Sequence, residues 1–161
     1  MELDRNFEYL LYLLLRRTTQ AVGKVREKEL NASGTNSRKA GVFSAILLLG
    51  EDVTLAKIAK LLFLESHSIS EQIKRMEKDG LVKKEKDVKN IVRISITDKG
   101  YEMYLTTEIQ ESIDVIMSVL KKREKIQLWR ILSKMRDKAV NELGITNPDL
   151  FPPSEYTDAK S

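Results

Sequence analysis

Residues Ile58 to Val82 read IAKLLFLESHSISEQIKRMEKDGLV, and this stretch decides how the rest of the chain is interpreted. Its second half carries apolar residues at positions i, i+4 and i+7, the spacing of a buried helix face: Ile69, Ile73 and Met76. The pattern predicts a short helix from Ser66 to Asp79. Gly80 follows it in the position that commonly ends a helix.

The opposite face of this predicted helix carries hydrogen-bonding and cationic side chains. On a wheel of about 100° per residue, the residues farthest from the apolar face are His67, Glu71, Lys74 and Lys78, flanked by Ser70 and Arg75. Such a helix fits the major groove of DNA, which is about 12 Å wide and displays the base edges. The same pattern also fits an ordinary solvated helix face.

The cluster Ser66-His67-Ser68 raises the alternative of a hydrolytic site. A serine nucleophile needs a base held by a third group and an oxyanion hole. His67 is one residue from each serine, so the side chains diverge on a helix, and no glycine-rich elbow surrounds them. We interpret Ser66 as a helix N-cap, with Ser68 and Glu71 as an alternative capping box. We therefore expect no enzyme here.

Three helices are predicted before the helix that starts at Ser66. Apolar residues at helical spacing from Phe7 to about Glu29 predict a long first helix, and residues 30–37 read as a loop whose Asn36 or Ser37 can cap the next helix. Residues 38–49 predict a short, largely buried helix ended by Gly50. Thr54 can cap a third helix, which leads into the quoted stretch.

After Gly80 the apolar period changes from helical to alternating. Val82 begins one predicted strand, and residues 92–96 form the second. Between them KEKDVKN is a charged turn with Asp87 and Asn90 as turn formers. Short helices followed by a two-stranded ribbon make a winged helix-turn-helix. Basic residues on or near the ribbon can contact the DNA backbone or enter the minor groove: Lys83, Lys84, Lys86, Lys89 and Arg93.

Two helices are predicted after the ribbon. Thr97 caps a helix whose apolar seam runs at helical spacing from Tyr101 to Leu120, over 20 residues. KKREK (residues 121–125) interrupts the seam, and a last helix continues from Ile126 to Gly144. The remaining tail holds all three prolines and reads as extended.

Composition excludes several classes of site. The chain has 161 residues, 42% hydrophobic and 32% charged, which suits one compact domain with helical extensions. Cysteine is absent, so disulfides and thiolate chemistry are excluded, and a lone histidine makes a metal site or other bound cofactor unexpected.

The net charge of +4 is a mild bias toward polyanions. No apolar run approaches the roughly 20 residues of a membrane span, and MELDRNFEYL lacks a cleavage signal, so we expect a soluble, cytoplasmic protein with no membrane partner.

The quoted stretch resembles the MarR (multiple antibiotic resistance regulator) family of transcription factors. The segments in register are Ile58-Ala59, Ser68-Ile69-Ser70, Arg75-Met76-Glu77 and Gly80-Leu81-Val82. ISITDKG (Ile94 to Gly100) resembles the family's exit from the wing. The resemblance implies a homodimer in which the first helix and the last two pack across a two-fold axis. Each subunit then offers one winged domain to a pseudo-palindromic DNA site.

Two departures from the family pattern stand out. The wing tip of the family often carries D-x-R, and here Lys89 replaces the arginine, which keeps the charge and removes the planar fork. Glu65 stands where the family has a serine or threonine cap, which moves the expected cap to Ser66.

The expected fold is mainly α (α+β minor), a winged helix-turn-helix with long N- and C-terminal dimerisation helices. Its expected parts are residues 1–36, an N-terminal dimerisation helix and loop; 37–100, the DNA-binding domain; 101–146, the C-terminal dimerisation helices; and 147–161, the extended tail. Trp129 and the Phe151-Pro-Pro tail add apolar surface beyond what a winged domain can cover. The alternative is a monomer whose helices fold back.

We expect a sequence-specific transcriptional regulator, a homodimeric repressor of a promoter site that a small-molecule effector can release. The recognition-helix residues expected at double-stranded DNA are Ser66, His67, Ser68, Ser70, Glu71, Lys74 and Arg75. Those expected on the wing and backbone side are Thr54, Lys84, Lys86, Lys89, Asn90 and Arg93. An effector pocket can involve Tyr9, Tyr12, Arg16 or Arg17, although solvation explains the arginines equally well. The alternative function is a winged-helix module for protein–protein assembly, with the helix face on an acidic partner.

Overall fold

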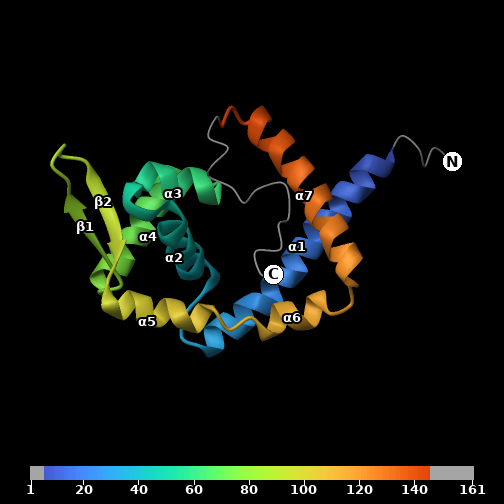
Figure 1. The fold of residues 1–161 in the computed structure, drawn as a ribbon, viewed down its shortest axis with the longest axis horizontal. Coiled ribbons are helices and arrows are strands. Elements are labelled where there is room, and N and C mark those ends of the chain that lie inside the picture. The colour runs from blue at the N-terminus through green and yellow to red at the C-terminus, as the bar shows by residue number, and fades with distance from the viewer. Residues whose placement is uncertain (1–5, 146–161) are drawn as a thin grey trace.

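A computed structural model describes residues 6–145, so the predicted tail lies outside the described part of the chain. Its elements in order are α1 (Phe7–Ala32), α2 (Ser37–Leu49), the 3-10 helix η2 (Gly50–Asp52), α3 (Leu55–Leu62), α4 (Ser66–Lys78), β1 (Val82–Lys86), β2 (Val92–Ile96), α5 (Asp98–Thr107), α6 (Glu111–Met117) and α7 (Lys122–Glu142). Figure 1 shows the winged domain on one side and α1 and α7 on the other. The predicted fold class, mainly α with one small sheet, is confirmed.

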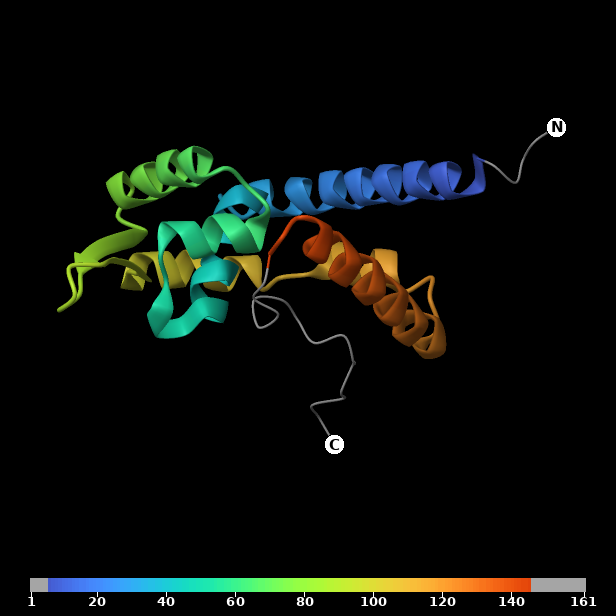
Figure 2. The same cartoon turned by 90° about the horizontal axis from the view of Figure 1, so that it is seen from above.

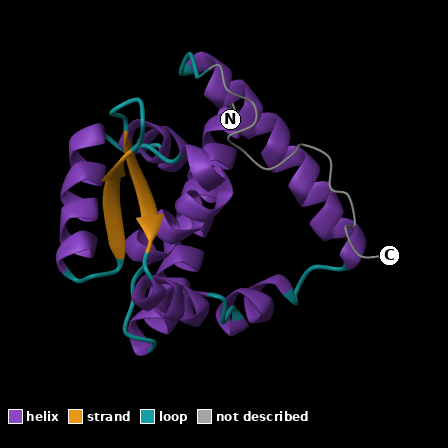
Figure 3. Cartoon of the chain, turned by 60° about the vertical axis from the view of Figure 1, so that its left-hand side comes forward, coloured by secondary structure: helices purple, strands orange, loops and turns teal. Residues whose placement is uncertain are grey.

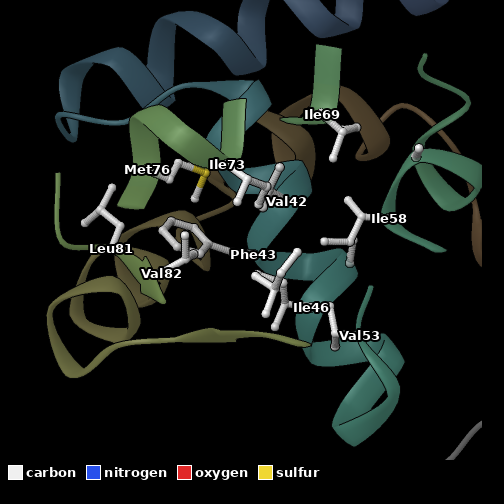
Figure 4. Close-up of a cluster of buried hydrophobic side chains, with 13 residues drawn as sticks. Val42, Phe43, Ile46, Val53, Ile58, Ile69, Ile73, Met76, Leu81 and Val82 are labelled. Atoms are coloured by element: carbon white, nitrogen blue, oxygen red, sulfur yellow. The ribbon is translucent and has the colours of Figure 1, made fainter. Parts of the chain in front are cut away.

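The winged domain is built around one core shared by α2, α3, α4 and the sheet (Figure 4). Phe43, Ile58, Ile73 and Met76 have 0% of their surface exposed. Each such side chain contributes about 1.5–3 kcal/mol by leaving water. The ring of Tyr104 on α5 packs edge-on against Phe43, with centroids 6.4 Å apart, so α5 belongs to this core as well.

Local signals in the sequence fix the starts and ends of the first helices. Asn36 caps α2, because its side-chain oxygen accepts the backbone N–H of Lys39 at 2.9 Å. Thr54 caps α3 in the same way, with a longer contact of 3.4 Å to the N–H of Lys57. These outcomes confirm both predicted caps. The predicted loop is shorter than expected, because α1 continues to Ala32.

The wing is a two-stranded antiparallel ribbon. Val82 pairs with Ile96, and Lys86 pairs with Val92. Ile94 points into the core and its backbone N–H donates to the carbonyl of Val53 at 3.2 Å, which ties the wing to the segment before α3. The two predicted strands are therefore confirmed, whereas the charged turn is shorter than predicted, because β1 continues through residues 84–86.

The C-terminal end of α4 is fixed directly on the N-terminal end of α5. Gly80 has φ +72°, a conformation that favours glycine, and it turns the chain into the wing. Thr97 donates its hydroxyl to the carbonyl of Gly80 at 2.6 Å and its backbone N–H to that of Leu81 at 3.1 Å. Gly100 lies so close that an added Cβ would be 1.9 Å from the Leu81 oxygen.

The predicted single helix from Tyr101 to Leu120 is wrong. The chain forms two helices there, α5 and α6, separated at residues 108–110. The apolar seam continues through the break, so periodicity carried no sign of it. The physical reason is tertiary, since side chains of α1 bind the backbone groups that the break leaves unpaired.

The interruption at KKREK is also placed differently from the prediction. α7 already begins at Lys122, inside the basic segment, and the break lies just before it. The carboxylate of Glu124 accepts the backbone N–H of Lys121 at 2.7 Å, which stabilises a start at this point.

Helices α1 and α7 extend away from the winged domain (Figures 2 and 3). Each exposes an apolar stripe with the spacing i, i+3, i+4 and i+7. The stripe of α1 is Phe7, Leu10, Leu11 and Leu14, and that of α7 is Leu128, Ile131, Leu132 and Met135. Among the helices of residues 6–145, none combines the length and apolar character that crossing a bilayer needs.

Candidate nucleic-acid interface

Helix α4, the predicted recognition helix, buries one face and turns the other outward, as the sequence predicted. Ile69, Ile73 and Met76 are at most 1% exposed. The predicted DNA-facing residues that are exposed are Ser66, His67, Ser68, Glu71, Lys74 and Arg75, and Ser70 is half-buried. One surface of the helix therefore presents hydroxyl, imidazole, ammonium and guanidinium groups together.

The start of α4 differs from the expectation that Ser66 is its cap. Glu65 occupies the N-cap position with extended backbone angles (φ −67°, ψ 142°), and no side chain caps the helix there. The carbonyl of Glu65 already accepts the N–H of Ile69 at 3.2 Å, which makes Ser66 the first helical residue and leaves Ser68 and Glu71 inside the helix. The sequence offered Ser66 and Ser68 as candidate caps, and the backbone geometry places neither of them at the N-cap position. The first-turn N–H groups thus keep their affinity for an anion such as phosphate.

Charge on the outer face of α4 is only loosely engaged. Lys74 lies 3.3 Å from the Glu71 carboxylate, and their side chains are 64% and 55% exposed. Exposed pairs three residues apart on a helix contribute about 0.2–0.5 kcal/mol. Lys74 can therefore exchange this partner for a DNA phosphate or base at little cost.

The wing tip is organised by the carboxylate of Asp87. One oxygen accepts the backbone N–H groups of Lys89 at 2.8 Å and Ile91 at 2.9 Å. The other accepts Nε of Arg93 at 3.0 Å. These hydrogen bonds lower the pKa of Asp87 below its ordinary value, and the bond from the backbone N–H of Ile91 has the largest effect. Asn90 has φ +61° and completes the turn.

The predicted wing cations divide into paired and unpaired ones. Lys84 binds Glu77 of α4 at 2.8 Å, and Arg93 binds Asp87. Lys83, on the same strand, binds Glu85 at 2.8 Å. Lys86 and Lys89 are exposed and pair with no carboxylate among residues 6–145. The tip therefore offers two available charges.

One cation beside α4 was not predicted from the sequence. A cavity of about 500 Å³ lies between α2 and α4, and its lining includes Arg38, Gln72 and Arg75. Arg38 is exposed at the start of α2, so it adds a cation to the recognition surface. The only signal in the sequence was the basic pair Arg38-Lys39 at a helix start.

The other candidate chemistries are not assembled in the described part of the chain. Within residues 6–145, no three acidic or histidine side chains come together as metal ligands. No hydrogen bond joins His67 to Ser66 or Ser68 in that range. Tyr9, Tyr12 and the two arginines after them are exposed on α1.

Comparisons with known proteins agree with this geometry. Residues 48–100 match the family described as winged helix DNA-binding domain. No curated protein matches the chain by sequence. The fold is similar to the organohalide sensing RdhR-CbdbA1625 transcriptional regulator in its ligand free form, with a TM-score of 0.76 and 26% identity over 94% of this chain and 91% of that chain.

The same regulator in its 2,4-dichlorophenol bound form gives a TM-score of 0.73 and 25% identity over 96% of this chain and 90% of that chain. A cysteine-to-serine mutant of MarR from E. coli, complexed with operator DNA, gives a TM-score of 0.73 and 16% identity over 81% of this chain and 96% of that chain. At that identity the likeness concerns the fold alone.

Proposed function

Because the chain carries a winged helix DNA-binding domain and has the fold of the MarR-family regulators, we propose that it is a sequence-specific transcriptional regulator. It works as a homodimeric repressor on a pseudo-palindromic promoter site, in the cytoplasm. One observation carries the proposal. The outer face of α4, whose N-terminus has no side-chain cap, and the exposed lysines of the wing tip belong to the same winged domain, so one domain presents both groups of cations.

The residues divide into those that read bases and those that hold the backbone. His67, Ser68 and Ser70 lie in the N-terminal half of α4, the part of a recognition helix that reaches base edges most easily. Lys74 lies one turn after Ser70 on the same helix and completes the group proposed to read bases. The residues that hold phosphates are Thr54, Arg75, Lys89 and Arg93. Thr54 and Arg93 also have structural partners, so Lys89 supplies the backbone charge most directly.

The apolar stripes of α1 and α7 support a dimer. Both stripes are exposed and both have the same helical spacing. Monomeric proteins rarely leave such contiguous apolar faces in water. A second copy of the chain covers them across a two-fold axis, which places two recognition helices on one side of DNA.

Small-molecule control is part of the proposal. The similar regulator is known in a form bound to 2,4-dichlorophenol. In this chain the cavity between α2 and α4 borders the face proposed for DNA, so a ligand there competes with DNA for the same surface.

Selecting bound sequences from a random pool of double-stranded DNA, followed by titration of the selected site, tests the proposal. Lys89→Ala should weaken binding to every sequence and lower the slope of log affinity against log salt by about one. Lys74→Ala should also change which bases are preferred. Lys138→Ala, which removes an exposed charge on α7, is the matched control and should change neither.

A wild-type chain that forms no salt-sensitive complex at low salt contradicts the proposal. That outcome favours the second candidate, a winged-helix module whose basic helix face binds an acidic protein partner.

A further inference from the structure

An ion pair on α1 joins the two helix ends at the break between α5 and α6. The guanidinium of Arg26 donates to the backbone carbonyls of Thr107 and Ile109 and to the carboxylate of Glu29. Glu29 accepts the backbone N–H of Ser112 at 2.9 Å and its hydroxyl at 2.5 Å. We call Arg26, Glu29 and Ser112 the latch.

The latch satisfies backbone groups that a helix break leaves unpaired. The last carbonyls of α5 and the first N–H groups of α6 have no partner within their own helices. Charged side chains make such hydrogen bonds about twice as strong as neutral ones do. The planar fork of Arg26 reaches two carbonyls at once, which an ammonium group on a flexible stem does less well. Arg26 and Glu29 are 18% and 17% exposed at the side chain, so water competes weakly for them.

The other end of α5 is fixed on the recognition helix. Thr97 binds the carbonyl of Gly80, and Lys99 donates to the carbonyl of Asp79 at 2.8 Å. Gly100 rests against Leu81 with no room for a side chain. α5 therefore connects the end of α4 to the latch without a flexible joint.

Helix α1, which carries Arg26 and Glu29 of the latch, also carries one of the apolar stripes proposed for the dimer. α5 has 10 residues and is about 15 Å long. A tilt of roughly 10° at the latch moves its other end by about 3 Å. Neighbouring base pairs are about 3.4 Å apart. A small change at the latch thus shifts the recognition helix by nearly one base pair.

We propose that Arg26 and Glu29 are positioning residues that set the separation of the two recognition helices and so determine which half-site spacing the dimer accepts. The proposal rests on the proposed function, since it needs a dimer that binds two half-sites. The bland alternative is that the latch only adds stability, which affects all DNA sites equally.

Half-site spacing is the readout that separates these two roles. The selected DNA site is prepared with its half-sites moved apart or together by one and two base pairs, and also as a single half-site. The variants are Arg26→Ala and Glu29→Gln, with Lys28→Ala as the control that removes an exposed charge of the same helix.

Wild type and Lys28→Ala should prefer one spacing. Arg26→Ala and Glu29→Gln should lower the DNA affinity about tenfold at that spacing and much less at the other spacings. The plot of affinity against spacing therefore flattens, while the affinity for the single half-site stays unchanged. Equal weakening at every spacing and on the half-site, or an unchanged profile, overturns the proposal.

A distance measurement without DNA tests the latch separately. The chain has no cysteine, so Thr18→Cys on α1 and Val88→Cys on the wing give unique sites for two spin labels. Val88 is 102% exposed and tolerates a label. Labelled chains diluted into unlabelled ones report the distance between α1 and the wing tip within one subunit.

The latch variants should shift the mean of that distance distribution, or widen the distribution, by about 3 Å or more, as expected from a tilt of α5. Lys28→Ala should leave the distribution unchanged. A chain that binds no DNA overturns the proposed function, whereas an unchanged distance in both latch variants overturns the latch by itself.

Discussion

The carboxylate of Asp87 determines the shape of the wing tip. It binds two backbone N–H groups of the turn and the side chain of Arg93 on the opposite strand. Arg93 is therefore engaged in structure, and Lys89 beside it is not. This division is why Lys89→Ala reports on phosphate contact alone, while a change at Arg93 also loosens the turn.

Gly100 and Gly23 make opposite predictions for the same substitution. An alanine Cβ at position 100 would be 1.9 Å from the Leu81 oxygen and 2.9 Å from Cγ2 of Ile96, so Gly100→Ala should lower the free energy of unfolding by about 1–3 kcal/mol. Gly23 lies inside α1 with nothing within 4 Å of an added Cβ, so Gly23→Ala should raise it by about 0.5–1 kcal/mol. Urea unfolding at one fixed protein concentration measures both, and equal effects would contradict the close packing of Gly100.

At the scale of elements, α3 and α4 are the two helices of the helix-turn-helix, and their N-termini are capped differently. Thr54 caps α3 with its side chain, whereas Glu65 leaves the first turn of α4 without a side-chain cap. The helix proposed to meet phosphate is thus the one whose N–H groups remain available. The turn between them uses Phe63 in a left-handed conformation (φ 53°).

The caps give a matched pair of alanine substitutions. Thr54→Ala should destabilise the protein by about 1 kcal/mol, because it removes an N-cap. Ser66→Ala should change stability by less than about 0.5 kcal/mol, because this exposed residue caps nothing. Thermal or urea unfolding compares them, and a larger loss for Ser66 would restore it as the cap.

The break between α5 and α6 predicts a pH dependence of stability. Hydrogen bonds from Ser112, together with Arg26, lower the pKa of Glu29 from 4.5 to about 2. Its contribution is therefore complete above pH 4.5 and is lost as the pH falls toward 2. The difference in unfolding free energy between wild type and Glu29→Gln should be constant at neutral pH and shrink below 4.5.

Urea unfolding at a series of pH values measures this difference. Asp87 and Glu27, whose pKa values are also lowered, remain in both proteins and cancel in the comparison. A difference that stays the same across the range would show that the charge of Glu29 is not what matters.

At the scale of the molecule, the winged domain has its own hydrophobic core, whereas the apolar stripes of α1 and α7 are not buried in any core. Their apolar stripes face outward, and Figure 3 shows α7 standing apart from the domain. In the proposed dimer, contact with a second copy buries these stripes and at the same time brings the two copies of α4 together. Assembly through α1 and α7 is thus proposed to position the two copies of α4 for DNA binding.

Leu14, 63% exposed at the C-terminal end of the α1 stripe, tests this arrangement. Leu14→Glu places a charge in the proposed interface and should leave only a species of about 18.5 kDa in sedimentation at micromolar concentration. It should also weaken binding to the full DNA site far more than to a half-site. Arg16→Glu, on the opposite side of α1, should leave the dimer intact. A wild-type chain that sediments as a monomer would contradict the dimer.

The sequence by itself determined the local elements and their faces. Apolar spacing of 3.6 and 2 residues is a property of neighbours along the chain, so the buried face of α4, the wing and the cap by Thr54 could be predicted. The resemblance to the MarR family, together with these elements, predicted the winged helix-turn-helix fold, and this fold is confirmed. The sites on α4 and the wing remain predictions for DNA binding.

Only the tertiary structure decided where α5 ends, how α4 begins and which cations are held. The latch joins Glu29 to Ser112, 83 positions apart, and no periodic pattern records such a contact. Likewise Arg93 binds Asp87 because a turn brings the two strands together. Helix breaks and ion pairs depend on groups that meet only after folding, whereas helix faces depend on the chain beside them.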